Sequence, residues 1–135
     1  MTLKWRGDEV VSLINADMNT RVDGASRVLR NEARKLLSRA QPYKIYGKKG
    51  SRKRHGLDPS RPGEPPKKLS GALRIGVLQE KELLVPEARV GTNVPYGKWL
   101  EMGTRNIAPR PWLSAALRNK AAEIMRRFKI KVKWL

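Results

Sequence analysis

The sequence contains no cysteine and only one histidine, His55, among its 135 residues. Without cysteine, the chain cannot form a disulfide scaffold, a thiolate zinc site or a cysteine nucleophile. A single histidine excludes a two-histidine nuclease motif and a histidine-rich metal site. No apolar run approaches the roughly 20 residues that a membrane span needs, and residues 1–20 lack the apolar segment of a secretory signal.

Acidic residues are also scarce. Asp and Glu number 12 against 30 Lys and Arg, which gives a formal net charge of +18. The excess lies in two blocks, residues 41–70 and 109–135, which carry 14 of the 18 net charges. We expect polyanions to bind there first. Hydrophobic residues make up 39% of the chain, enough for one small core. The length predicts a single domain over residues 1–135.

The apolar pattern predicts a long helix near the N-terminus. From Val11 to Leu36, apolar residues recur every three or four positions, so we expect a helix from about Asp8 to Arg39. At 1.5 Å per residue it spans roughly 45 Å. That is long for so small a domain, and we expect one end to extend beyond its own core and pack on a neighbouring copy.

The rest of the chain predicts a mixture of loop, strand and helix. Nine Pro and Gly residues predict a long basic loop over 41–68. The remaining predicted elements are strands at 73–78 and 83–90 joined by a turn at 79–82, helices from Val94 to Gly103 and from Pro111 to Arg127, and a terminal strand at 129–135. The apolar face of the last helix is expected at Leu113, Leu117, Ala121, Ile124 and Phe128.

The predicted loop contains a dense basic segment. Its candidate polyanion contacts are Lys44, Lys48, Lys49, Arg52, Lys53 and Arg54. Two interpretations stay open: a solvated loop, or contact with a nucleic-acid backbone. No base-reading motif accompanies these residues. Any contact with DNA should therefore be directed at phosphates, sensitive to salt and independent of sequence.

The carboxylates offer no catalytic cluster, because most are spread along the long helix and the predicted hairpin. We therefore expect no enzymatic activity, no cofactor and no metal. Glu101 differs, because it lies in the last turn of a short predicted helix, where the helix dipole disfavours an anion. Its expected partners are Arg105, Arg110 or backbone N–H groups of the following turn. We interpret Glu101 as a structural clamp.

Four tryptophans accompany the single phenylalanine. Trp99 and Trp112 lie within predicted elements, and we expect both to pack in the core. Trp5 and Trp134 lie near the termini, which are poorly ordered unless they dock. Tryptophan is enriched at interface hot spots. The position of Trp134 therefore predicts that the C-terminal segment docks on another surface.

Several short motifs follow one another in the second half of the chain. They are Pro66–Arg74 before a predicted strand, Val90–Thr92, Tyr96–Thr104 (YGKWLEMGT) and Ala108–Leu113 (APRPWL). In this order they resemble a tailed-bacteriophage family of small neck and tail-completion proteins. The match covers roughly residues 65–120. The residues it marks for folding or assembly, together with the terminal tryptophan, are Tyr96, Trp99, Leu100, Glu101, Gly103, Thr104, Pro109, Pro111, Trp112 and Trp134.

The resemblance implies an α+β fold, in which a long N-terminal helix packs on a small antiparallel sheet. It also implies a homo-oligomeric ring at the head–tail junction of the virion, assembled in the host cytoplasm. The implied partners are other copies of the chain, the neighbouring head-connector and tail proteins, and DNA in the channel. The charge alone supports an alternative, a stand-alone nucleic-acid-binding protein. A phage nuclease is least favoured, because the sequence lacks a plausible metal site.

Overall fold

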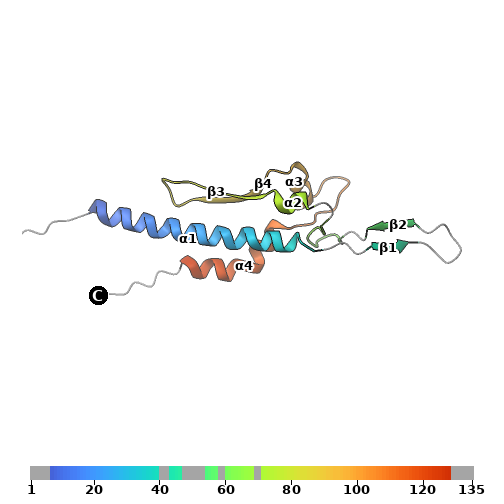
Figure 1. The fold of residues 1–135 in the computed structure, drawn as a ribbon, viewed down its shortest axis with the longest axis horizontal. Coiled ribbons are helices and arrows are strands. Elements are labelled where there is room, and N and C mark those ends of the chain that lie inside the picture. The colour runs from blue at the N-terminus through green and yellow to red at the C-terminus, as the bar shows by residue number, and fades with distance from the viewer. Residues whose placement is uncertain (1–6, 40–42, 47–53, 58–59, 69–70, 129–135) are drawn as a thin grey trace, which may run out of the picture.

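A computed structural model of the chain describes residues 7–39, 43–46, 54–57, 60–68 and 71–128. In chain order its elements are α1 (Gly7–Leu36), β1 (Tyr43–Tyr46), β2 (Arg54–Leu57), α2 (Ala72–Ile75), β3 (Val77–Lys81), β4 (Ala88–Thr92), α3 (Pro95–Met102) and α4 (Leu113–Phe128). Helix α1 lies between the β3–β4 hairpin and α4 (Figure 1). The expected α+β architecture is confirmed. The predicted terminal strand at 129–135 and Trp134 lie outside the described residues.

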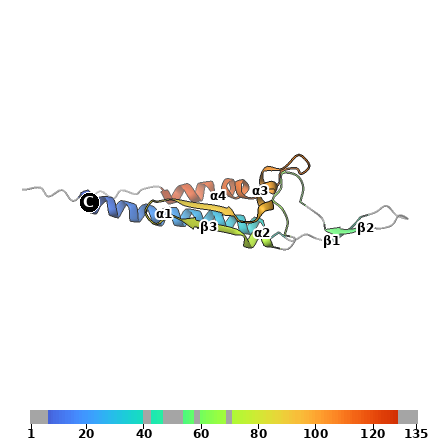
Figure 2. The ribbon, with the colours of Figure 1, turned by 90° about the horizontal axis from the view of Figure 1, so that it is seen from above.

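Helix α1 has 30 residues but packs along only part of its length. Asp8 and Glu9 lie in its first turn and Arg34 and Lys35 in its last, which suits the helix dipole. It ends at Leu36, three residues before the predicted end. Residues 8–17 are all exposed, whereas the buried positions begin at Ala25. Figure 2 shows the same N-terminal part of α1 reaching beyond α4 and the hairpin.

Strands β3 and β4 pair antiparallel, with Val77 opposite Thr92 and Lys81 opposite Ala88. The predicted strand at 73–78 is wrong over residues 73–76, and of its residues only Val77 and Leu78 lie in β3. There Gly71, at φ 86°, begins the short helix α2, and Ile75 donates its N–H to the Gly71 carbonyl. A positive φ is open to glycine at little cost, so the chain turns into a helix at this residue.

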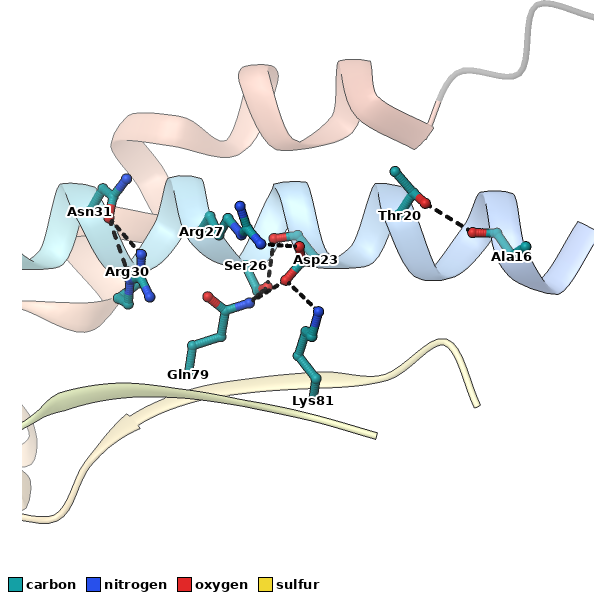
Figure 3. A network of polar contacts seen from close by, with 9 residues as sticks. All are labelled: Ala16, Thr20, Asp23, Ser26, Arg27, Arg30, Asn31, Gln79 and Lys81. Carbon is teal, nitrogen blue, oxygen red and sulfur yellow. Dashed lines mark hydrogen bonds and ion pairs between the residues drawn. The ribbon is translucent and has the colours of Figure 1, made fainter. Parts of the chain in front are cut away.

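The predicted turn at 79–82 is also misplaced, because the connection between the strands spans residues 82–87. Three polar contacts hold the end of β3 against α1 (Figure 3). Gln79 donates to Asp23 at 2.9 Å and to the Ser26 hydroxyl at 2.6 Å, and the Lys81 ammonium lies 3.2 Å from Asp23. Residues 79–81 therefore stay in the strand. Pro86 lies in the connection, where no ladder N–H is needed.

Segment 41–68 is not the uniform loop that its Gly and Pro content predicts. Strands β1 and β2 pair antiparallel, with Tyr43 opposite Leu57 and Tyr46 opposite Arg54. The sequence of β1, Tyr-Lys-Ile-Tyr, is rich in the aromatic and β-branched residues that favour strands. The Gly and Pro residues on either side of this run led to the prediction of a loop, although the run itself favours a strand.

The core lies where the C-terminal half of α1 meets α2, β3 and α4. Its buried residues are Ala33, Leu36, Leu37, Leu73, Val77, Trp112 and Ala116. The predicted apolar face of α4 is partly wrong, because Leu117 is exposed and Ala116 is completely buried. Ala33 and Ala116 have no exposed surface and belong to the same cluster, so small side chains let α1 and α4 approach closely.

Candidate assembly site

Glu101 joins α3 to the start of α4. One carboxylate oxygen accepts hydrogen bonds from the backbone N–H groups of Trp112 at 2.7 Å and Leu113 at 2.9 Å. The other accepts from the Ser114 backbone N–H at 2.9 Å and from the Ser114 hydroxyl. The first N–H groups of a helix have no partner within it, so Glu101 acts as a cap supplied by another helix. This confirms one of the three partners expected for Glu101, the N–H groups of the following turn.

This hydrogen bonding changes the acidity of Glu101. Burial alone would raise the pKa of its carboxyl. The donors from Ser114, Leu113 and Trp112 outweigh burial and lower the pKa below its ordinary value of 4.5. No ion pair joins Glu101 to Arg105 or Arg110 in the described part of the chain. The ionised carboxylate is thus held by α4 itself, next to the positive end of that helix dipole.

Two further contacts fix α3 against the core. Trp112 is only 2% exposed, and its indole N–H donates to the Gly97 carbonyl at 3.1 Å. A Cβ at Gly97 would lie 2.5 Å from the Thr92 methyl and 2.9 Å from Leu73, so only glycine permits this packing. Trp112 is in the core as predicted. The Y-G-K-W-L-E motif therefore provides both a close helix contact and the cap of α4.

The turn after α3 also depends on particular residues. Gly103 adopts a φ of 76°, and its N–H donates to the Trp99 carbonyl at 2.8 Å, which ends the helix as predicted. Thr104 pairs with Ile107, and the Arg110 N–H donates to the Leu100 carbonyl at 2.6 Å. The Pro109 carbonyl accepts from Gly63, and Pro111 comes just before the capped turn of α4. These contacts turn the chain back toward α1.

The prediction that Trp99 packs in the core is wrong. Its side chain is 53% exposed, and Tyr96, Met102 and Ile107 are also exposed. Leu100 is half-buried and packs against the core, so the opposite side of α3 carries the packing. We call Tyr96, Trp99, Met102 and Ile107 the α3 patch. An exposed patch rich in large apolar side chains is typical of an interaction surface.

Among the described residues, large apolar side chains are also exposed elsewhere, and two groups of them are close together in sequence. The first, which we call the helix-end patch, consists of Val10, Val11, Leu13 and Ile14 on the unpacked part of α1. The second is at residues 82–87, which we call the hairpin tip, where Leu83 is 88% and Leu84 92% exposed. The run Leu-Leu-Val could have indicated an exposed hairpin tip. Instead, it was interpreted as part of the predicted strand at 83–90.

The candidate polyanion contacts are only partly described. Lys44 lies in β1 opposite Gly56, and Arg54 lies in β2 opposite Tyr46. Lys48, Lys49, Arg52 and Lys53 lie outside the described residues, as do Trp5 and Trp134. The structure thus brings Lys44 and Arg54 into one hairpin and leaves the predicted DNA contact untested.

Within the described residues, no helix is both long enough and apolar enough to cross a membrane. The same residues contain no cluster of three or more His, Asp or Glu side chains that could hold a metal ion. Among the described residues, the α3–α4 region is therefore the best candidate for a functional site, because it combines the Glu101 cap with the exposed α3 patch.

Comparisons with known proteins identify no relative of this chain. No protein-family model matches the chain, and neither a curated protein nor a solved structure matches it significantly.

Proposed function

We propose that this protein is a structural component of a tailed-bacteriophage virion, where it forms a homo-oligomeric ring at the head–tail junction. It works by fitting against copies of itself and against the neighbouring head-connector and tail proteins, without bond chemistry. The observation that carries the proposal is the exposure of large apolar side chains in three places, the helix-end patch, the hairpin tip and the α3 patch. Contacts between subunits would bury them.

The motif order between residues 65 and 120 supplies the viral part of the proposal. Its key residues have structural roles that suit an assembly protein: Glu101 caps α4, Gly103 ends α3, and Trp112 lies in the core. Together they give α3 a fixed position, so that Tyr96 and Trp99 are presented on a rigid element. A preorganised surface loses less entropy on association than a mobile one does.

The positive charge fits a place beside packaged genome. A ring multiplies the charge of each copy, so two blocks of net +7 per chain would give a strongly positive annulus around the channel. Such a surface would hold DNA through phosphate contacts without reading its sequence.

The proposal is tested by electron microscopy of phage particles that lack this protein. We expect separate full heads and free tails, because the joint between them is missing. Intact particles with tails attached, or absence of the protein from purified virions, would contradict the proposal.

The charge of +18 also supports a second candidate, a stand-alone nucleic-acid-binding protein. Sizing with light scattering separates the two functions. A chain that is monomeric at all concentrations and binds DNA tightly at low salt favours the second candidate, whereas a closed oligomer favours the ring.

A further inference from the structure

In Figure 1, the connection between β3 and β4 lies at one end of the hairpin, and α2 and α3 lie at the other. A surface of opposite charge lies at each of these ends. One is the hairpin tip, residues 82–87. The other is a cavity of about 300 Å³ next to α2 and α3, which we call the basic pocket. Strand β3 has five residues, which extend roughly 17 Å, and it separates the two surfaces. A chain therefore cannot place its own hairpin tip in its own basic pocket.

The walls of the basic pocket are apolar in part. Leu37, Leu73 and Leu100 line it, and all three belong to the core or pack against it. Tyr96 of the α3 patch also lines it. A pocket of this size is at the lower end of the range for ligand sites, so it suits a few side chains of a partner segment.

The remaining walls are strongly basic. Lys67, Lys68, Arg74 and Arg110 line the basic pocket, and none of the described acidic residues does. The Arg110 Nε is buried and has no hydrogen-bond partner among the described residues. A buried donor without a partner is costly, and a carboxylate brought into the pocket would supply the missing acceptor. The pocket is therefore suited to a segment that is both apolar and anionic.

The hairpin tip has that composition. Its sequence, Glu-Leu-Leu-Val-Pro-Glu, places three apolar side chains between Glu82 and Glu87. The backbone is fixed by hydrogen bonds from the Glu82 N–H to the Glu87 carbonyl and from the Glu87 N–H to the Val85 carbonyl. Leu83 and Leu84 are almost fully exposed. Such a preformed turn can dock with little loss of conformational freedom.

We propose that the hairpin tip of one copy docks in the basic pocket of a second copy. Leu83 and Leu84 enter between the leucines of the pocket, and Glu82 and Glu87 lie against its cationic rim. The inference rests on the proposed homo-oligomer and names the surfaces that join its subunits. The contact is head-to-tail, since each copy offers a tip on one side and a pocket on the other. Contacts of this type generate rings when the rotation closes.

Charge reversal on either surface provides the first test. We expect E82K/E87K and K68E/R74E each to raise the concentration needed for assembly by about tenfold or more, because like charges then meet. The control R118E/R126E makes the same charge change as the pocket variant on exposed residues of α4, and it should assemble as the wild type does. Sedimentation velocity measures assembly, and circular dichroism checks that each variant is folded.

An apolar substitution tests the tip without changing its charge. Leu84→Ser should weaken assembly by a similar factor and leave the melting temperature unchanged, since the side chain is 92% exposed. Met125→Ser, at an exposed position on α4, is the matched control and should leave assembly unchanged. Equal assembly of the Leu84 and Met125 variants would overturn the proposal.

Mixing the two charge variants gives the most specific readout. The tip variant keeps a normal pocket and the pocket variant keeps a normal tip, and the reversed tip of the first is complementary to the reversed pocket of the second. An equimolar mixture should therefore assemble with the two variants alternating, whereas each variant alone should not. A chain that carries all four substitutions should assemble again, because its charges are complementary. A mixture that assembles no better than either variant alone, or no rescue in the fourfold variant, would overturn the proposed docking.

The outcomes separate this inference from the proposed function. If the wild-type chain forms rings and the tip and pocket variants do so equally well, the docking is wrong while the homo-oligomer stands. If the wild-type chain stays monomeric at every concentration, both are wrong.

Discussion

The two ends of α1 differ in how much of the molecule covers them. The C-terminal half packs between the β3–β4 hairpin and α4, and it contributes Ala33 and Leu36 to the core. None of the described elements covers the N-terminal third in this way, and Leu13 there is 70% exposed. Both parts carry the same amphipathic pattern. The difference teaches that a continuous apolar stripe can serve two purposes, with one part for the fold and the other available to a partner.

The largest expected effect comes from comparing two tryptophans, Trp112 in the core and Trp99 on the surface. Trp112→Ala should destabilise the fold by about 3–5 kcal/mol, because it removes a buried indole and its hydrogen bond to Gly97. Trp99→Ala should cost less than about 1 kcal/mol, because the side chain is half exposed, while it weakens assembly. Urea unfolding compares the two. Equal losses of stability would remove the distinction between core and surface.

The Glu101 cap should have the next largest effect. Glu101→Gln keeps the shape of the side chain but places an amide NH₂ among the N–H donors of Trp112, Leu113 and Ser114. We expect a loss of about 0.5–2 kcal/mol, the usual range for an N-cap. Glu123→Gln on α4 is a control with the same change of charge, at a partly exposed carboxylate that pairs with Lys120 and caps no helix. A Glu101 variant as stable as this control would show that the cap contributes nothing.

Acid should weaken the hydrogen bonds between the Glu101 carboxylate and the start of α4. The pKa of Glu101 is lowered in the folded state, so its contribution to stability is complete above the ordinary value of 4.5 and is lost as the pH falls through the folded value. Asp23, held by Lys81 and Arg27 despite the opposing effect of burial, also has a lowered pKa and adds to the same trend. The melting temperature of Glu101→Gln should fall less steeply below pH 4.5 than that of the wild type. Parallel curves would contradict this assignment.

A smaller effect on stability is expected in the helix-end patch. Leu13→Ser should change the free energy of unfolding by less than about 0.5 kcal/mol, because the side chain is 70% exposed. It should still weaken assembly, which light scattering measures. Leu36→Ser, at the packed end of α1, should instead unfold the chain. If Leu13→Ser lowers the melting temperature as much as Leu36→Ser does, the N-terminal third of α1 is part of the monomer core.

The smallest effect on stability is expected from the basic segment. Replacement of Lys48, Lys49, Arg52, Lys53 and Arg54 by alanine should leave the melting temperature nearly unchanged. It should weaken DNA binding and reduce its dependence on salt, because counterion release scales with the number of phosphate contacts. Unchanged binding, or a large fall in melting temperature, would contradict the interpretation of this segment as a polyanion contact.

The sequence predicted the elements with strong local signals. The long repeat of apolar residues located α1, and Pro95 and Gly103 located α3, because proline and glycine have positional preferences at helix ends. Glu101 was recognised as a clamp because an anion at a helix C-terminus requires compensation. Its actual partners came from α4, and they could be named only as one of three alternatives.

The incorrect predictions share a physical cause. In each case, contacts between elements far apart in the chain determine the structure, and the local sequence pattern does not contain them. Gln79 and Lys81 continue β3 because Asp23 of α1 binds them, so the turn moved to residues 82–87. Ala116 rather than Leu117 is buried because α4 approaches α1 closely there. Trp99 is exposed although its hydrophobicity predicted burial. The basic pocket combines residues far apart in the chain, so no single segment could reveal it.

Sedimentation of the purified wild-type chain over a wide range of concentrations shows whether the chain assembles with itself. We expect a closed oligomer of defined mass that forms from the 15.4 kDa chain as the concentration rises. A single 15.4 kDa species at every concentration would contradict it.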